Sequence, residues 1–361
     1  MITAAPRLPR ALALVALALV VLAGVSASAD PGPLLGGAPM VSGPTGLLVL
    51  AAALAVMVVL GLPLFVIIAV IATLCLVLLS ENFRGWLTLD RLSETSAEMM
   101  GKDVLLAIPF FVVSGAIMSA GGIAQRLVDF ARALVGWLPG GLAVAAVMAC
   151  VIFAAISGSS PVTVIAIGSM MYPRLLKAGY DRQFTLGLLT SAGSLGILIP
   201  PSIPMLVYAI VAAGSQPIDV AELFLAGVLP GLLIGGLMAL YSMVRSRGAV
   251  EREPFDLRVV WERLRDGVWA ISLPLVILGG IYTGVFTPTE AAAVSVVYAL
   301  IVELLIHRDI SAQDLPAILS EAVVNMGTIL IIMALAFGLN AFLVEEMIPQ
   351  KIVAWILDKE L

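Results

Sequence analysis

Apolar segments long enough to cross a lipid bilayer recur along almost the whole chain, and no polar stretch between them is long enough to form a soluble domain. The 361 residues are 61% hydrophobic and only 12% charged, whereas soluble domains carry roughly 25% charged residues. Backbone polar groups must be satisfied inside hydrocarbon, so such segments form helices. The sequence therefore predicts an all-α polytopic membrane protein and excludes a soluble one.

The first 46 residues have the pattern of an export segment followed by a linker. Arg7 and Arg10 precede an apolar stretch, and the pattern over 1–29 fits either a cleavable signal peptide or an uncleaved signal-anchor helix. Because Lys and Arg stay on the cytoplasmic side, the Pro- and Gly-rich linker 30–46 should emerge on the opposite side. The next apolar run, 47–79, would be about 50 Å long as a single helix. A Gly-Leu-Pro sequence near its middle leaves open whether it forms two short spans or one tilted span.

Lys and Arg concentrate in alternate loops, which orients the later spans. Three lie between residues 174 and 182, none lies between 214 and 221, and six lie between 245 and 265. The positive-inside rule then favours the order inside, outside, inside for these loops. The predicted spans are 183–213, 222–244, 268–286, 290–306 and 323–344, with an amphipathic cytoplasmic surface helix at 246–266.

A polar cluster interrupts the apolar run from 142 to 171. Its sequence, Ser157-Gly158-Ser159-Ser160-Pro161, places three hydroxyls and two helix-breaking residues where a regular helix would lie in hydrocarbon. Such a cluster is tolerated where protein or a water-filled cavity surrounds it. Each flanking arm would be only about 22 Å long as a helix. This length favours a re-entrant hairpin with its tip at solute depth, and a single kinked span is the alternative.

A second interruption follows in the next span. The segment 191–204 contains three prolines, and Pro200-Pro201 supplies no amide donors. The helix should therefore unwind before this pair and restart near Ser202. The freed carbonyl oxygens of residues 193–199 are neutral ligands of the kind that a sodium ion takes, and the N-terminus of the following half-helix can face a carboxylate. Two adjacent broken elements predict a transport site.

Three motifs in this order and spacing resemble the large membrane (permease) subunit of tripartite ATP-independent periplasmic (TRAP) transporters, from about Gly46 to the C-terminus. The motifs are Ser157-Gly158-Ser159-Ser160-Pro161-Val162-Thr163, the run from Gly196 to Pro204, and Thr283-Gly284-Val285-Phe286-Thr287-Pro288-Thr289-Glu290-Ala291-Ala292-Ala293. The resemblance implies an inverted-repeat, elevator-type transporter with a re-entrant hairpin and broken helices in a bacterial inner membrane. It also implies sodium-coupled uptake of an organic acid, such as a C4-dicarboxylate or a sugar acid. The implied partners are a small four-helix membrane subunit and a periplasmic substrate-binding protein.

The resemblance further implies a sodium site between the hairpin tip and the broken helix, with no other metal and no cofactor. Its cation-binding residues would be Ser157, Gly158, Ser159, Ser160, Thr163, Gly193, Ser194 and Gly196. The residues facing the substrate would be Pro200, Pro201, Ser202, Thr287 and Glu290. For Thr287-Pro288-Thr289-Glu290, a capping box at a helix start explains every residue and is preferred to a coupling role for the carboxylate.

The N-terminal pattern and the resemblance together divide the chain into segments with different roles. These are a signal segment (1–29), a periplasmic linker (30–46), N-terminal scaffold and connecting helices (47–135), a hairpin and broken helix forming the transport domain (136–215), scaffold helices with the amphipathic segment (216–322) and the start of a second repeat (323–361). Similarity between residues 111–128 and 336–353 indicates this internal repeat. Its second copy would need about seventy more residues for a second hairpin and broken helix, and we expect these to be absent.

Other functional classes receive less support. No GxxxxGK[ST] phosphate loop occurs, so ATP is not the energy source, and the scarcity of mid-span Asp, Glu and His favours sodium over protons. His307 is the only histidine and Cys75 and Cys150 lie in apolar runs, so neither a zinc site nor a disulfide is expected. An ion channel, or another anion transporter working without a binding protein, is the main alternative. A hydrolase using Ser157 or Ser159 lacks a nearby base, and no basic patch indicates nucleic-acid binding.

Overall fold

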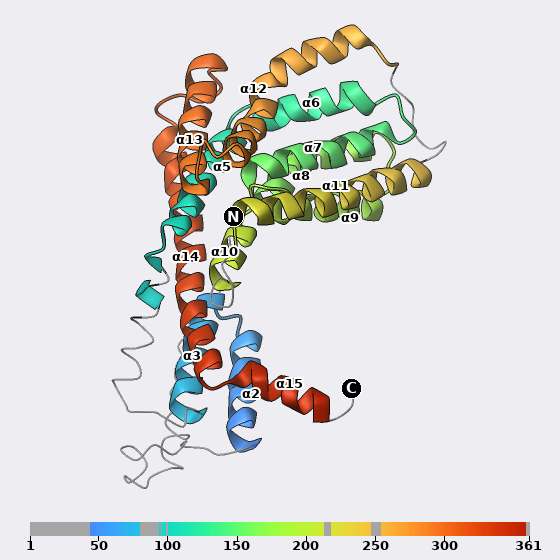
Figure 1. Ribbon diagram of the computed structural model, residues 1–361. Coiled ribbons are helices and arrows are strands. Elements are labelled where there is room, and N and C mark those ends of the chain that lie inside the picture. Colours follow the sequence, from blue (N-terminus) through green and yellow to red (C-terminus); the bar gives the residue numbers. More distant parts are fainter. Residues whose placement is uncertain are drawn as a thin grey trace, which may run out of the picture. The chain divides into compact units, whose positions relative to one another are not determined.

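The computed structural model describes residues 44–79, 94, 96–98, 100–212, 218–246 and 254–358, and regular structure in these segments is helical throughout (Figure 1). The predicted signal segment and nearly all of the linker that follows it lie outside the described residues. The elements are α2 (Pro44–Val59), α3 (Leu64–Leu79), η2 (Asp103–Leu106), α5 (Ala107–Ala120), α6 (Ile123–Val135), α7 (Gly141–Ser157), α8 (Ser160–Lys177), α9 (Arg182–Gly193), η3 (Ser194–Ile197), α10 (Ile203–Ala212), α11 (Val220–Arg245), α12 (Leu257–Tyr282), α13 (Pro288–Leu300), η4 (Ile301–Ile306), α14 (Leu315–Glu345) and α15 (Ile348–Asp358).

Five of these helical segments are long and apolar enough to cross a membrane. They are Asp103–Ala120, Val220–Arg245, Leu257–Tyr282, Pro288–Ile306 and Leu315–Glu345. Large apolar side chains on α11, such as Leu229 at 76% exposed, point away from the protein. Such surfaces are stable in lipid and not in water, so the all-α polytopic membrane class predicted from composition is confirmed.

The described residues form two compact units, one within 1–102 and 327–361 and the other within 103–326. In the first unit α2 and α3 pack against each other, and Gly61 between them adopts the left-handed conformation (φ +64°). The run 47–79 therefore contains two helices, which resolves the alternative left open by the sequence. Cys75 and Phe342 are buried together in this unit, and Cys75 is a free thiol.

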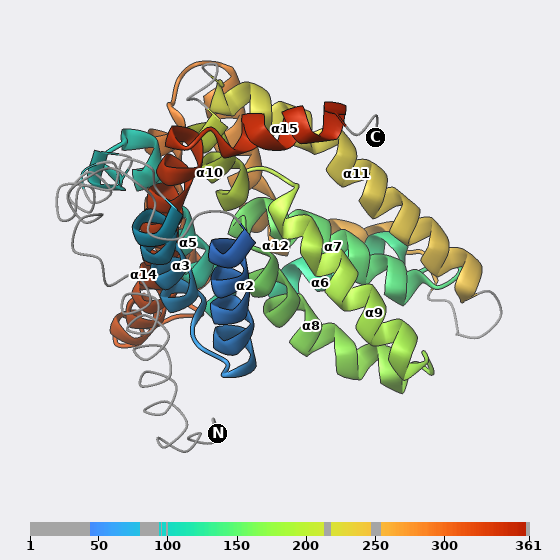
Figure 2. The same cartoon turned by 90° about the horizontal axis from the view of Figure 1, so that it is seen from below.

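The second unit is a helical bundle in which α6, α7, α8, α9 and α11 run side by side (Figures 1 and 2). The helix α7 lies inside the bundle, and nearly all of its small side chains are buried. Alanine and glycine let neighbouring helices approach closely, which is the usual way that helices associate in lipid. The same unit contains α5, α12 and α13, with α13 packed along α5 and α12 packed against α6.

One predicted boundary was wrong. The surface helix predicted at 246–266 and the span predicted at 268–286 are largely one continuous helix, α12, which Asp256 caps by accepting a hydrogen bond from the Arg258 amide at 2.8 Å. Gly267 does not end it, because glycine weakens a helix without preventing its hydrogen bonds. The span predicted at 323–344 lies within a longer helix, α14, whose first turns from Leu315 are less apolar than its centre.

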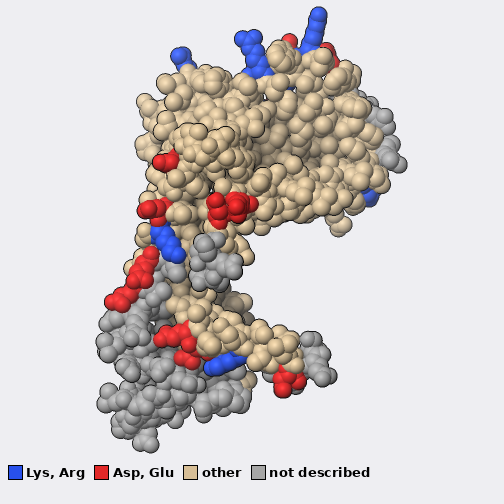
Figure 3. Space-filling model, viewed as in Figure 1, with Lys and Arg blue, Asp and Glu red and all other residues tan. Residues whose placement is uncertain are grey.

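The charged half of α12 stands out on the surface of the second unit. Figure 3 shows Lys and Arg side chains gathered at the margin of this unit near α12, whereas most of the face in view is uncharged. Arg258, Arg263 and Arg265 in the first half of α12 are exposed. The amphipathic character predicted for residues up to 266 is therefore present, but within a longer helix than expected.

Candidate functional site

The polar cluster forms the connection between two packed helices, α7 and α8. The helix α7 ends at Ser157, and Gly158 adopts the left-handed conformation (φ +58°) that glycine favours just after a helix. Ser159 has extended backbone as the N-cap of α8, and Pro161 lies in the first turn, where a missing amide costs nothing. The predicted pair of short helices is confirmed, and the single kinked helix is excluded.

Three oxygen atoms lie close together at this hairpin tip. The hydroxyls of Ser157 and Thr163 are 2.9 Å apart, and the Thr163 hydroxyl donates to the Ser159 carbonyl at 2.9 Å. The Ser157 hydroxyl is 3.3 Å from the same carbonyl oxygen. Ser157 and Thr163 are 2% and 0% exposed. The tip therefore contains a buried triangle of neutral oxygens, which we call the oxygen triad.

The hairpin tip is in direct contact with the broken helix. The amide of Ile203, the first residue of α10, donates to the Gly158 carbonyl at 3.3 Å. A Cβ atom on Gly158 would lie 2.5 Å from the Pro201 carbonyl oxygen, and one on Gly196 would lie 2.7 Å from the Ser159 carbonyl oxygen. Both glycines are therefore required for a backbone-to-backbone approach. The two interruptions in the sequence meet in one place.

The broken helix has the form that its prolines predict. The helix α9 ends at Gly193, a short 3₁₀ turn follows, and α10 starts at Ile203, one residue after the predicted restart. Ser202 is buried and donates to the Ile197 carbonyl at 2.7 Å, which supports the chain across the gap. The first amide of α10 is already bonded to Gly158, so this part of the helix terminus faces the hairpin.

The remaining residues predicted to bind the cation differ in their surroundings. Gly193 is buried beneath Val164 of α8, and Ser160 is half-buried at the start of that helix. Ser194 is exposed, and its hydroxyl donates to the Ser191 carbonyl at 2.7 Å. Gly193 therefore supports packing at the site, whereas the Ser194 hydroxyl is directed to its own helix.

The segment beginning at Thr287 forms a helix cap. The Glu290 carboxylate accepts hydrogen bonds from the Thr287 amide at 2.8 Å and hydroxyl at 3.0 Å, and the Glu290 amide donates to the Thr287 hydroxyl at 3.3 Å. This is a complete capping box at the start of α13, with Pro288 in the first turn. The capping interpretation is confirmed, and both side chains are exposed.

The helix α5 supports the hairpin tip, a role that the motifs did not indicate. A Cβ atom on Gly115 would lie 3.2 Å from the Ser157 Cα, so α5 passes close to the tip at this position. The adjacent Ser114 is fully buried and donates to the Ser295 carbonyl of α13 at 3.1 Å. A Ser-Gly pair inside an apolar helix is the signal for such close packing.

At its other end, the hairpin is tied to α6 by polar side chains. Arg174 near the end of α8 donates to Gln125 at 2.9 Å and to Asp129 at 3.4 Å. Both carboxylate and guanidinium remain partly exposed, so this pair contributes little to stability. It joins the end of α8 to α6.

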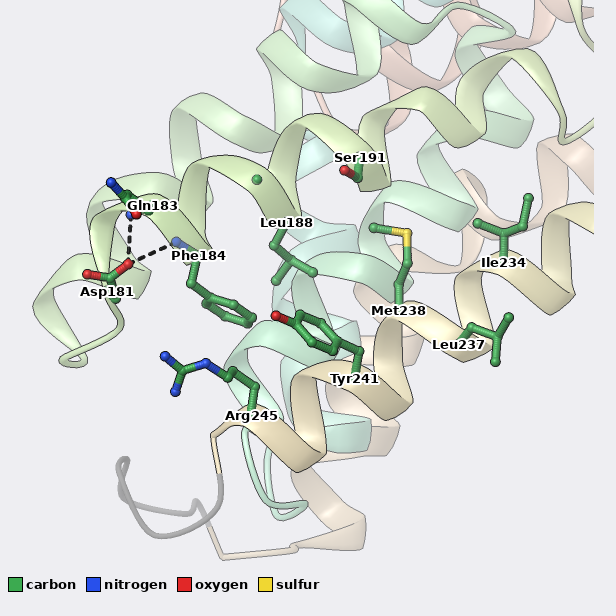
Figure 4. A pocket seen from close by; sticks show the side chains of 11 residues that line it. Asp181, Gln183, Phe184, Leu188, Ser191, Ile234, Leu237, Met238, Tyr241 and Arg245 are labelled. Carbon is green, nitrogen blue, oxygen red and sulfur yellow. Dashed lines mark hydrogen bonds between the residues drawn. The ribbon is translucent and has the colours of Figure 1, made fainter.

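A separate pocket of about 600 Å³ lies between α9 and α11. Figure 4 shows Phe184, Leu188, Met238 and Tyr241 lining it, with Asp181 turned to the start of α9. Asp181 is occupied as the N-cap of α9 and accepts hydrogen bonds from two amides of that helix. The lining includes none of the residues predicted to bind the cation or the substrate. Its lining is mainly apolar, with Gln183, Ser191 and Arg245 as further polar members.

Comparison with known proteins decides the family. Residues 51–360 match the family model described as the tripartite ATP-independent periplasmic transporter, DctM component. The chain belongs to this family. The family consists of transporter permeases and not of enzymes. The resemblance inferred from the three motifs is thereby confirmed.

Three relatives illustrate the range of solutes named for such permeases. The C4-dicarboxylate TRAP transporter large permease protein DctM of Rhodobacter capsulatus is 41% identical over 70% of this chain and 60% of its own length. The ectoine/5-hydroxyectoine permease UehC of Ruegeria pomeroyi is 46% identical over 58% of this chain and 49% of its own length. The isethionate permease DctMQ of Oleidesulfovibrio alaskensis is 36% identical over 76% and 44%. The chain spans about half of the length of these relatives.

Proposed function

We propose that this protein takes part in sodium-coupled uptake of an organic acid, such as a C4-dicarboxylate, a sugar acid or a similar carboxylate. A periplasmic binding protein would deliver the solute, and a small four-helix membrane subunit would complete the complex in the bacterial inner membrane. Family membership supports transport and these partners. The solutes named for the relatives are small polar molecules, and most of them are acids. The relative named DctMQ supports association with a small subunit.

The observation that supports sodium as the coupling ion is the meeting of the oxygen triad with the broken helix. Calcium, a hard cation, takes oxygen ligands at roughly 2.3–2.6 Å. Sodium is similar to calcium in size, so similar distances are expected for it. Two such ligands at right angles are roughly 3.3–3.7 Å apart. The separations within the triad, 2.9 to 3.3 Å, would need only a small expansion to reach this range.

Neutral oxygens fit a singly charged ion better than a divalent one, because no carboxylate is needed to balance the charge. We therefore assign the ion to the Ser157 and Thr163 hydroxyls, the Ser159 carbonyl and the carbonyls of the break near Gly196. Ser159 contributes its carbonyl oxygen to the triad, and its hydroxyl is not used as a helix cap. Gly158 and Gly196 act by allowing close approach.

The substrate would lie beside this ion, against Pro200, Pro201 and Ser202. A bound cation next to the cavity would attract a carboxylate, so the solute and the ion would bind more tightly together than separately. Thr287 and Glu290 bond to each other, and the proposal leaves them out of the substrate site. Movement of the hairpin and the broken helix as one elevator-type body against the scaffold would expose the site to each side in turn.

The test is uptake by proteoliposomes that contain the product of the full reading frame carrying this sequence, the small subunit and the binding protein. Labelled succinate would serve as the C4-dicarboxylate probe and labelled gluconate as the sugar-acid probe. We expect accumulation under an inward sodium gradient and its loss when choline replaces sodium. Equal uptake in both salts would refute sodium coupling, and steady single-channel currents without the binding protein would indicate a channel.

A further inference from the structure

A buried glutamate at the end of α13 has no role in the proposed transport site. Glu303 lies in the π-helical turn Ile301–Ile306 and is 0% exposed. Neither of its carboxylate oxygens makes a well-formed hydrogen bond among the residues that the structure describes, although the Gly122 amide lies close enough to favour the ionised form. Short π-helical turns are uncommon and are often found at functional sites. A buried carboxylate without partners is costly when ionised, so its presence requires an explanation.

The carboxyl group of Glu303 rests on the turn between α5 and α6. A Cβ atom on Gly121 would overlap both the carboxyl carbon and its oxygens, so glycine leaves the space that the acid fills. The next residue, Gly122, donates its amide to Asp309 at 3.2 Å. Two acidic side chains from the end of the α13 span therefore converge on one glycine pair.

The cluster contains too few positive charges for both acids. Arg126 of α6 forms a short hydrogen-bonded ion pair with Asp309, and this pair holds the pKa of Asp309 below its usual range. Burial and the nearby guanidinium lower the pKa of His307, so a positive charge on this side chain is disfavoured. With Arg126 balanced by Asp309, an ionised Glu303 would leave one uncompensated negative charge.

Among the residues that the structure describes, no cation other than Arg126 acts on the Glu303 carboxyl group. The helix α5 contains no charged residue. On α12, the carboxylate of Asp266 interacts electrostatically with Arg126 and His307. This carboxylate lies 4.0 Å from the Arg263 guanidinium. The Arg308 side chain turns back to the Leu305 carbonyl at 3.3 Å. The charged groups that act on Glu303 itself are Asp309, whose negative charge favours the neutral form of the acid, and Arg126, which opposes it.

We propose that Glu303 is a proton-binding site, held as a neutral carboxylic acid where α13 meets the turn between α5 and α6. Protonation removes the uncompensated charge and lets the side chain fill the space above Gly121. Release of the proton leaves a carboxylate whose nearest compensating cation is Arg126, which is already bound to Asp309. The ionised Glu303 carboxylate would then compete with Asp309 for Arg126, and this would weaken the contact between Asp309 and the Gly122 amide. This site is independent of the sodium proposal.

Infrared spectroscopy of the purified protein in nanodiscs tests the proposal directly, because only a protonated carboxyl shows the carbonyl stretch of a carboxylic acid. We expect such a band at pH 7 in the wild type, its loss in Glu303→Gln and its retention in Glu262→Gln, an exposed acid on α12. Gln resembles the neutral acid in shape and polarity, so the variant should fold. A spectrum in which Glu303→Gln removes no acid band would overturn the proposal.

Two further measurements test whether Glu303 is protonated without relying on one variant. Carboxyl-¹³C glutamate incorporated into the wild type should shift the band, and a band that does not move would contradict assignment to a glutamate. The folded protein binds a proton that the unfolded chain releases, so the unfolding midpoint of the wild type should fall as pH rises from 5 to 9. This fall should be smaller in Glu303→Gln than in Glu262→Gln, and equal slopes would contradict the proposal.

Discussion

Replacement of Gly158 by alanine tests whether the hairpin tip and the broken helix are in contact as described. Two costs add at this position. The left-handed backbone (φ +58°) costs an L-residue about 1–2 kcal/mol. The new Cβ would lie 2.5 Å from the Pro201 carbonyl oxygen, a backbone atom that cannot rotate away, and such overpacking costs about 1–3 kcal/mol. The total expected loss of stability is roughly 2–5 kcal/mol.

The chain offers a matched control for each cost. Gly284 has φ +73° and nothing within 4 Å of a Cβ, so Gly284→Ala should lose only the backbone part, about 1–2 kcal/mol. Gly168 lies within α8 with no positive φ and open space around it, so Gly168→Ala should gain about 0.5–1 kcal/mol. The difference between the first two variants isolates the contact with the broken helix.

The assay is thermal unfolding in one detergent at one heating rate, followed by size-exclusion chromatography of the protein that stays folded. For a unit of this size 1 kcal/mol corresponds to about 2–4 °C. Gly158→Ala should therefore unfold roughly 2–12 °C below Gly284→Ala. Equal midpoints for these two variants would refute the contact between Gly158 and Pro201, and with it the proposed site.

Three other expectations concern neighbouring contacts. Gly196→Ala should weaken uptake and stability together, because its Cβ would lie 2.7 Å from the Ser159 carbonyl oxygen, and normal uptake with normal stability would contradict that contact. The hydrogen bond from Arg126 holds the pKa of Asp309 below its usual range. The ion pair therefore stabilises the fold at any pH above the usual carboxyl pKa, and this stabilisation is lost as the pH falls and Asp309 is protonated in the folded protein. Asp309→Asn should therefore flatten the acid limb of the stability profile below about pH 4, and an unchanged acid limb would argue against the pair. Thr287→Ala should cost about 1 kcal/mol through the lost cap while the sodium dependence of uptake stays constant, and a changed sodium dependence would return this segment to the transport site.

Local chemistry explains why much of the site could be predicted from the sequence. Gly158 ends one helix, Ser159 and Pro161 begin the next, and these preferences act within a few residues. The same holds for the break before Pro200, where a missing amide makes a continuous helix impossible. The capping box at Thr287 is likewise local. Such features require no knowledge of the rest of the fold.

Other features depend on contacts between distant segments and could not be predicted. The support of Ser157 by Gly115 joins residues on different helices, and glycine in an apolar helix has several uses. The burial of Glu303 depends on a π-helical turn, which leaves no distinct hydrophobic period. The predicted separation of 246–266 from the following span was wrong because an amphipathic and an apolar pattern can share one helix axis. The sequence could not show whether residues 47–79 form one helix or two, because a glycine such as Gly61 can either kink a helix or end it.

The most direct test of the account is the sodium dependence of uptake in Thr163→Val. Valine keeps the shape of threonine and removes the hydroxyl that lies 2.9 Å from both other members of the oxygen triad. Loss of one ligand worth about 1.4 kcal/mol should raise the half-saturating sodium concentration about tenfold. The control is Thr190→Val on α9, whose exposed hydroxyl donates to the Leu186 carbonyl. A half-saturating sodium concentration that is the same in both variants would contradict the assignment of the ion to the hairpin tip.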